Sequence, residues 1–239
     1  MTAAIELAPN IWRIPTTPMD LVNSYLFRSD DGSLALVDTG IKGAPKRIIA
    51  AIEETGASVQ DVTTILLTHA HADHAGGARE MTSAVGCGTT VHEDDAEYVR
   101  TGTGTPLDPS TRLGRMLKRV QSSDPAPVER TLTDGEVLPI AGGLQVLHTP
   151  GHSPGHVSLL HPESGTLVTG DAIWNMWSRR SWPVLSFCTN APLTEKTAHR
   201  LAEVEYTTAA FTHGPHIADV GRTAVQDFLR NPRRFPGLW

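Results

Sequence analysis

The sequence predicts an α/β fold, because short β-rich runs alternate with helical patterns along its 239 residues, and several of these runs end at a histidine or an aspartate. Hydrophobic residues make up 39% of the chain, which is enough to bury an ordinary core. At this length we expect a single domain over residues 1–239. The formal net charge of −6 gives no basic footprint, so neither nucleic acid nor an anionic membrane surface is an expected partner.

The first residues and the cysteines bear on where the protein is located. Residues 1–6 lack a basic region followed by an apolar stretch, and no apolar run approaches the length that spans a bilayer. The two cysteines, Cys87 and Cys188, are far apart and have no paired spacing, so no disulfide framework is expected. These features predict an intracellular protein, located in the cytoplasm.

The first predicted elements lead directly to polar residues. Leu34–Val37 is an apolar strand that stops at Asp38. Pro45 suits the first turn of a helix over 45–55, and residues 62–67 form a second strand rich in β-branched residues. The further expected elements are, in order, a helix at 75–85, a strand at 89–92, strands at 144–148, 157–160 and 167–169, a helix at 195–205, a strand at 209–212 and a helix at 218–230.

Residues 94–130 differ from this alternation, since they are rich in proline and glycine. We treat them as a variable insert that contains one helix. This helix carries four basic residues, which are Arg112, Arg115, Lys118 and Arg119. A basic helix face is usually just solvated, and the alternative is a lid over a cleft.

The densest group of chemically capable residues lies directly after the second strand, within residues 69–74. His69, His71, Asp73 and His74 offer imidazoles and a carboxylate, the ligand types suited to zinc or iron. Where a strand gives way to a turn, His69 and His71 can project to the same side, while Asp73 and His74 can face a second ion. A single histidine would more often be a solvated or hydrogen-bonded side chain, but four such residues together favour a metal site.

Three later residues extend the set. His152 and His156 flank a glycine-punctuated turn, and we favour His152 as a ligand because His156 begins the next strand. Asp171 alone would read as a turn aspartate, but a carboxylate can bridge two ions. His213 follows the last strand, and its neighbour His216 is taken as a bystander. Since these positions lie past the carboxyl ends of strands, we expect them to meet at one edge of the fold.

As an ordered set, these motifs resemble the metallo-β-lactamase superfamily. The matching segments are Val37–Gly40, His69–His74, Thr149–His152, Thr169–Asp171 and Thr212–Gly214, which together extend over nearly the whole chain. The resemblance implies a four-layer αββα sandwich with a dinuclear site at one edge of the sheets. It assigns His69, His71 and His152 to one ion and Asp73, His74 and His213 to the other, with Asp171 as the bridge. Asp38 could accept a ring N–H from a ligand histidine, and a turn-forming role after its strand is an equal alternative.

Charge arithmetic indicates the chemistry of such a site. Two divalent ions carry four positive charges, of which Asp73, Asp171 and a hydroxide remove three, leaving about one positive charge for a developing oxyanion. We expect two Zn²⁺, with Fe or Mn as alternatives, and a hydrolase whose metal-bridging hydroxide attacks an ester, thioester or lactone carbonyl of a small molecule. Asp73 would also be catalytic, because it could orient the nucleophile or receive its proton.

The segment after Asp171 bears on the substrate. Trp174, Trp177 and Arg179 could line the pocket for a partly apolar substrate with an anionic group, or the tryptophans could pack the domain or the interface of a homo-oligomer.

Within the superfamily, glyoxalase II-like thioesterases and quorum-quenching lactonases share the ligand set. The helical C-terminal domain of the first group is not identifiable here, and Trp174 stands where the second has a tyrosine. A β-lactamase is a less expected activity. The redox alternative resembles a persulfide dioxygenase with one iron on His69, His152 and Asp171, and a metal-binding protein without catalysis is the third class.

Overall fold

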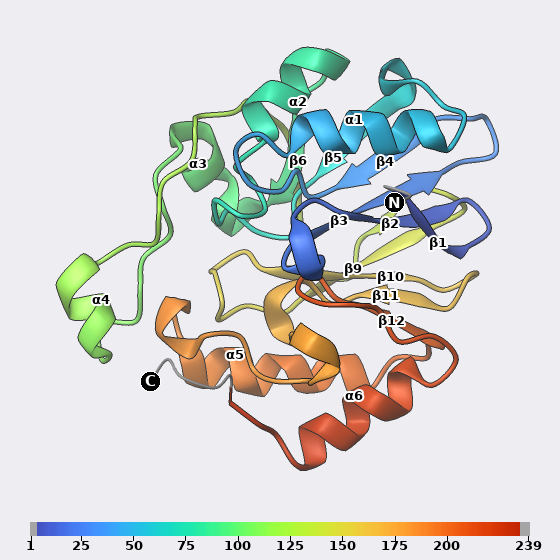
Figure 1. Ribbon diagram of the computed structural model, residues 1–239. Helices are drawn as coiled ribbons and strands as arrows, with labels where there is room; N and C mark the ends of the chain where they lie inside the picture. The colour runs from blue at the N-terminus through green and yellow to red at the C-terminus, as the bar shows by residue number, and fades with distance from the viewer. Residues whose placement is uncertain (1–3, 235–239) are drawn as a thin grey trace.

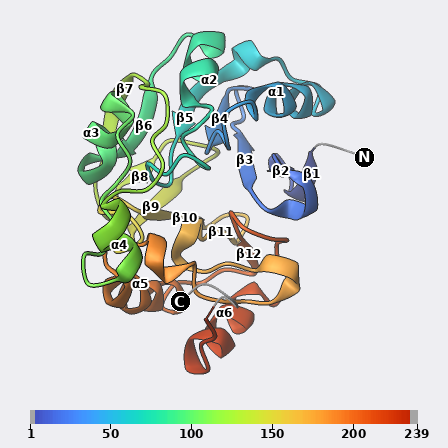
Figure 2. The ribbon, with the colours of Figure 1, turned by 60° about the vertical axis from the view of Figure 1, so that its left-hand side comes forward.

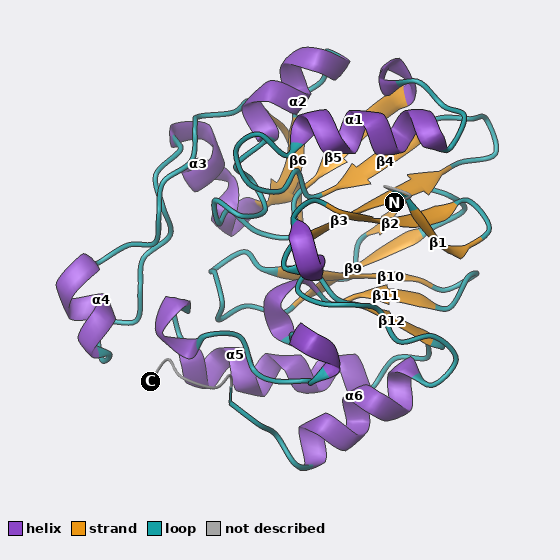
Figure 3. Ribbon diagram, in the orientation of Figure 1, coloured by secondary structure: helices purple, strands orange, loops and turns teal. Residues whose placement is uncertain are grey.

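The computed structural model describes residues 4–234, which form two β-sheets packed face to face with helices on both outer sides (Figures 1 and 3). The seven-stranded sheet has the strand order β1-β2-β3-β4-β5-β6-β7, and the five-stranded sheet has the order β12-β11-β10-β9-β8. The strands of the first sheet are β1 (Ile5–Ala8), β2 (Ile11–Pro15), β3 (Asn23–Arg28), β4 (Leu34–Val37), β5 (Val62–Leu66), β6 (Thr89–His92) and β7 (Val128–Leu132). Those of the second are β8 (Val137–Leu138), β9 (Leu144–His148), β10 (Val157–His161), β11 (Thr166–Val168) and β12 (Thr208–Ala210). The αββα sandwich implied by the sequence is confirmed.

Three apolar cores hold together the four layers, which Figure 2 shows from another side. The helices are α1 (Pro45–Glu54), α2 (Ala78–Val85), α3 (Glu93–Thr101), α4 (Arg112–Leu117), α5 (Ala191–Thr197) and α6 (Gly221–Arg230). Ile48 and Ile52 of α1 pack on the outer face of the seven-stranded sheet, and Phe228 of α6 packs on the outer face of the other. Between the sheets, Phe27 and Leu159 are fully buried. Removal of this apolar surface from water is the main force that closes the sandwich.

Strand direction determines where the functional loops lie. β4, β5, β6 and β7 are mutually parallel, so their carboxyl ends share one edge of the first sheet. β10 is antiparallel to both β9 and β11, and β12 is parallel to β11, so β9, β11 and β12 also end at one edge. Loops that follow these strands therefore converge from both sheets.

The predicted strands agree with the observed bounds to within two residues, and the helix predicted at 45–55 begins at Pro45 as expected, whereas the helices predicted from residues 75, 195 and 218 differ at their starts. The helix expected at 195–205 begins at Ala191, because the Asn190 side chain caps it by accepting from the Leu193 N–H, and it ends as a 3₁₀ helix, Ala198–Ala202. The helix expected from residue 75 begins at Ala78, since residues 75–77 still belong to the turn after His71. The three strands before residue 34, and also β7 and β8, were not predicted.

Residues 94–130 contribute to the sandwich at both of their ends. Most of α3 and the start of β7 lie in this range, and Val99 belongs to the first core. Between them, α4 projects from the body on two connecting segments, in which Leu107 N–H donates to Lys118 O and Val120 N–H donates to Thr105 O (Figure 1). We call residues 104–120 the α4 arm. The helix expected to carry four basic residues ends at Leu117, so two of them lie beyond it.

A membrane-spanning helix requires both a minimum length and a largely apolar sequence. Within residues 4–234, no helix combines the length and the apolar character needed to cross a bilayer.

Candidate metal centre

The seven residues predicted as metal ligands come together where the strand ends of the two sheets meet. His69 follows β5 and His152 follows β9, one from each sheet. Asp171 and His213 follow β11 and β12. All seven except Asp73 are buried, and the Asp73 side chain is 39% exposed.

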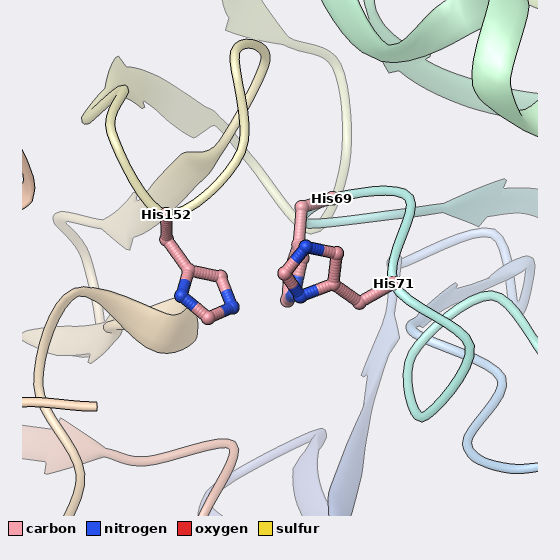
Figure 4. A group of neighbouring side chains, drawn as sticks. All are labelled: His69, His71 and His152. Carbon is pink, nitrogen blue, oxygen red and sulfur yellow. The ribbon is translucent and has the colours of Figure 1, made fainter. Parts of the chain in front are cut away.

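The first cluster consists of His69, His71 and His152. One nitrogen of each ring lies within 4.8 Å of the others. The ring centroids of His152 are 4.8 Å from His69 and 4.4 Å from His71. Figure 4 shows the His152 ring facing the other two from the opposite loop. These distances are those of donors that can converge on one ion.

The second cluster consists of Asp73, His74 and His213. The Nε2 atoms of His74 and His213 are 3.2 Å apart. A carboxylate oxygen of Asp73 lies 3.5 Å from His213 Nε2 and 3.8 Å from His74 Nε2. The set of two imidazoles and one carboxylate is again suited to a transition metal ion.

Asp171 lies between the two clusters. Its Oδ2 is 3.2 Å from the Nε2 atoms of both His152 and His213, and its Oδ1 is 3.4 Å from His74 Nε2. The turn that holds it requires a glycine, because Gly170 has φ +54° and a Cβ there would lie 2.5 Å from His156 Nε2. A single carboxylate thus contacts members of both clusters, which is the position of a bridge.

His156, the rejected alternative to His152, supports Asp171. Its Nε2 accepts the Asp171 N–H at 2.7 Å, and its Nδ1 lies 3.0 Å from the Thr149 carbonyl oxygen. Burial lowers the pKa of His156 to about 3, so the ring is neutral and its Nε2 can accept. His216 belongs to none of these clusters.

Each of the five histidines has one ring nitrogen bonded to the protein, which leaves the other nitrogen for an ion. The pairs are His69 Nδ1 with Thr68 Oγ1 at 3.0 Å, His71 Nε2 with Thr105 Oγ1 at 2.8 Å, His74 Nδ1 with Asp38 Oδ2 at 2.8 Å, His152 Nδ1 with Cys188 Sγ at 3.4 Å, and His213 Nδ1 with the carbonyl oxygen of Leu21. Such partners fix the ring orientation and the tautomer of metal ligands.

Two orphaned nitrogens test whether the residues fit a metal. Among the described residues, the Nε2 atoms of His69 and His152 are buried and make no hydrogen bond of good geometry, although Asp171 Oδ2 lies 3.2 Å from the His152 atom. A buried polar atom without a partner is costly, so it is usually explained by an ion or a water. The donor set and these two atoms therefore fit a metal centre.

The pKa values of His74 and His152 also indicate a site that attracts positive charge. Burial lowers the pKa of His74, but the carboxylates of Asp171, Asp73 and Asp38 outweigh burial and raise it to about 9. Burial likewise lowers the pKa of His152, but Asp171 and Cys188 outweigh it and raise the value to about 10. Protons therefore occupy these two rings in the absence of a cation.

His69 and His71 behave differently. Burial and the neighbouring histidines hold the pKa of both well below the usual value, so these rings are neutral and can donate to a metal.

A cleft of about 980 Å³ opens over the centre. His71, Asp73, His152, Asp171 and Trp174 line its floor and wall. The α4 arm contributes Leu107, Leu117 and Arg119, so the arm covers part of the cleft. The other two predicted substrate residues, Trp177 and Arg179, are not among the described residues that line it.

Several residues that hydrogen-bond to the candidate ligands were not predicted from the sequence. Thr105 and Cys188 were missed because nothing local marks a threonine or a cysteine as the partner of a distant histidine. Thr68 adjoins the motif and was not assigned a role, although its hydroxyl joins Asp38 to His69.

A further group, His92, Asp94 and His148, also meets the distance requirement for a metal. The two rings are stacked, with centroids 3.9 Å apart and planes at 15°. The lone pair of an imidazole nitrogen lies in the plane of its ring, and two nearly parallel planes this far apart do not bring their lone pairs to one ion.

Comparison with known proteins agrees with this geometry. Residues 17–215 match the family described as the Metallo-beta-lactamase superfamily. Hydroxyacylglutathione hydrolase GloC of Haemophilus influenzae is 29% identical, over 69% of this chain and 72% of that protein. YybB of Bacillus subtilis, described as a probable metallo-hydrolase, is 27% identical over 80% of each chain.

Comparison with solved structures shows that the fold is also similar to that of known proteins. The crystal structure of TTHA1429 from Thermus thermophilus, described as a metallo-beta-lactamase family protein, has a TM-score of 0.69 and 29% identity. The similarity covers 94% of this chain and 80% of that one. Because the family match extends over most of the sequence, this chain belongs to the metallo-beta-lactamase superfamily.

Proposed function

We propose that the protein is a two-metal hydrolase that cleaves an ester, thioester or lactone bond of a small molecule. The observation that carries the proposal is that five histidines each keep one ring nitrogen for an ion, while Asp171 lies between the two clusters. Divalent ions in such a site supply Lewis acidity and, by lowering the pKa of water to about 7, a nucleophilic hydroxide at neutral pH.

The charge balance favours an uncharged reacting group. Two divalent ions, the carboxylates of Asp73 and Asp171 and one hydroxide sum to about one positive charge. The buried carboxylate of Asp38, 2.8 Å from His74, reduces this further. Of the cationic side chains that line the cleft, Lys42 pairs with Asp124 at 3.0 Å and Arg119 is held by the Gly104 carbonyl oxygen at 2.9 Å, so neither is directed at the two clusters by these contacts.

Asp73 and Trp174 are the groups best placed to act on substrate. Asp73 lines the cleft and is the most exposed of the seven clustered residues, so it can orient the nucleophile and receive its proton. Trp174 provides an apolar wall, and the α4 arm adds leucine side chains opposite the polar floor. This combination suits a substrate with an apolar part next to the carbonyl group.

Zinc is the metal that we propose, because five imidazoles and two carboxylates form an N/O donor set typical of it. The relationship to a hydroxyacylglutathione hydrolase supports thioesters as members of the test panel. His69, His152 and Asp171 alone would suit a single iron, so metal content separates hydrolysis from oxygen chemistry.

The test is an ester, thioester, lactone and β-lactam panel on protein of measured metal content. We expect about two zinc ions per chain and hydrolysis of at least one class that is lost when the ions are removed and returns when zinc is added. The matched variant Asp171→Ala should lose both metal and turnover. Full zinc loading without hydrolysis of any class, or one iron with oxygen uptake on a persulfide, would overturn the proposal.

A further inference from the structure

A buried carboxylate that touches none of the predicted ligand rings joins the two loops of the first cluster. Asp95 is 0% exposed and lies in the first turn of α3, after β6. One of its oxygens, Oδ2, accepts the Ala70 N–H at 2.9 Å and the Ser153 hydroxyl at 2.6 Å. The other, Oδ1, accepts the Gly155 N–H at 2.7 Å. The two acceptor oxygens are therefore used by three donors.

These donors come from opposite sides of the sandwich. Ala70 lies between His69 and His71 in the loop after β5, which belongs to the seven-stranded sheet. Ser153 and Gly155 follow His152 in the loop after β9, which belongs to the five-stranded sheet. Asp95 thus ties together the two loops whose separation sets the distance from His152 to His69 and His71.

The surroundings of Asp95 are built for this contact. A Cβ at Gly155 would lie 2.7 Å from the Asp95 nitrogen and 2.8 Å from its Cβ, so only glycine allows the loop to approach. An acid in the first turn of a helix is ordinarily a surface residue that interacts with the helix dipole, as Asp94 does with its exposed side chain. Burial raises the pKa of Asp95, and its three donors oppose that rise. A buried charge of this kind persists only where donors satisfy it.

We propose that Asp95 is a positioning residue for the first cluster, which holds the His69 and His152 loops at the spacing that one metal ion requires. This inference rests on the proposed metal site and deepens it. Because the hydrogen bonds of Asp95 go to the loops of His69 and His152 and not to Asp73 or His213, we expect it to affect the first ion more than the second. Loss of a partner that orients metal ligands typically weakens metal binding by about 10–100-fold.

The test uses Asp95→Asn, with Asp94→Asn as the matched control that removes the same charge from the same helix turn. In Asp95→Asn, an NH₂ group replaces one oxygen, so the N–H of Ala70 or of Gly155 faces another donor. We expect chelator competition to show one zinc dissociation constant raised by about 10–100-fold and the other changed by less than about threefold. Ser153→Ala, which removes a single donor, should give a smaller effect in the same direction and guards against misfolding of Asp95→Asn.

A metal-free measurement tests the same contact independently. Amide hydrogen exchange at Ala70 or Gly155 should be faster in Asp95→Asn than in Asp94→Asn. Equal exchange at both amides, or dissociation constants for both ions that are unchanged or equally weakened, would overturn the inference. If the wild-type chain bound no metal at all, the proposed function would fail, whereas normal wild-type loading with a silent Asp95→Asn would reject only the role of Asp95.

Discussion

Replacing Asp38 with asparagine should reverse the hydrogen bonding of two proposed ligand histidines without changing side-chain size. Asp38 Oδ1 accepts the Thr68 N–H at 2.7 Å, and Oδ2 accepts both the Thr68 hydroxyl and His74 Nδ1–H at 2.8 Å. A carboxylate can only accept, so His74 keeps a proton on Nδ1, and Nε2 is the nitrogen that gives up its proton to a metal. Through the Thr68 hydroxyl, the same logic reaches His69.

In Asp38→Asn the amide NH₂ replaces Oδ2, since the opposite orientation would set it against the Thr68 N–H. It then donates to His74 Nδ1, which must become an acceptor, and the proton moves to Nε2 where the ion should bind. The backbone should not contribute a defect, because Asp38 has φ +60° and asparagine tolerates this region well. We expect zinc affinity to fall by about 10–100-fold, the usual effect of a lost orienting carboxylate.

Folding stability should change less than metal binding. A hydrogen bond to a charged group contributes about 1.5–3 kcal/mol, and in a protein of this size each kcal/mol shifts Tm by about 2–4 °C. The metal-free variant should therefore melt roughly 3–12 °C below the wild type. Zinc titration against a chelator and thermal unfolding of the apo-protein measure the two effects, with the exposed Asp30→Asn as control. Zinc affinity within about threefold of the wild type would refute the tautomer argument.

Three other predictions concern the same centre. The pKa values of His74 and His152 without metal, about 9 and about 10, lie above neutrality, so zinc binding at pH 7 should release protons from these rings. Zinc affinity should therefore rise as the pH increases toward 9. Calorimetry in buffers of different ionisation enthalpy counts the released protons, and a count of zero would contradict the assignment of these two residues as ligands. Trp174→Ala should raise KM with zinc content unchanged, whereas unchanged kinetics on a confirmed substrate would return Trp174 to a packing role. Cys188→Ala removes the Sγ partner of His152 Nδ1 and should weaken the binding of one zinc ion by about tenfold. The control Cys87→Ala should leave the affinity for both ions unchanged. Equal zinc affinities in the two variants would contradict a role for Cys188 in orienting His152.

The fold and the clustering of the candidate ligands could be predicted because their signals are local. Apolar runs such as Leu34–Val37 and Leu144–His148 match the observed strands. A run of four or five mostly apolar residues is long enough for a buried strand but too short for a typical helix. The histidine motif at 69–74 is dense enough to be read without knowing what it contacts. The start of the helix at Ala191 was missed because its cap, Asn190, resembles an ordinary loop residue.

The partners of the ligands could not be predicted, since their signals are distant in sequence. Thr105 lies in a threonine- and glycine-rich stretch that reads as a loop, yet its hydroxyl bonds His71 from the base of the α4 arm. Asp95 reads as one of three acids in a helix's first turn, and only the fold reveals that it is buried while Asp94 is exposed. A hydrogen bond between segments that are far apart leaves no periodicity in either segment.

The contrast between ligands and their partners has a physical consequence for the site. Loops are normally the mobile parts of a fold, but here hydrogen bonds link the loops that carry the candidate ligands. Asp38 joins the end of β4 to the loop after β5, and Asp95 joins that loop to the loop after β9. His156 joins the start of β10 to the turn that holds Asp171. We therefore expect these buried polar cross-links between loops to hold the centre in place even without the ions. Because each link joins one loop to another close to the candidate ligands, loss of one link should affect the ion nearest to it more than the overall fold.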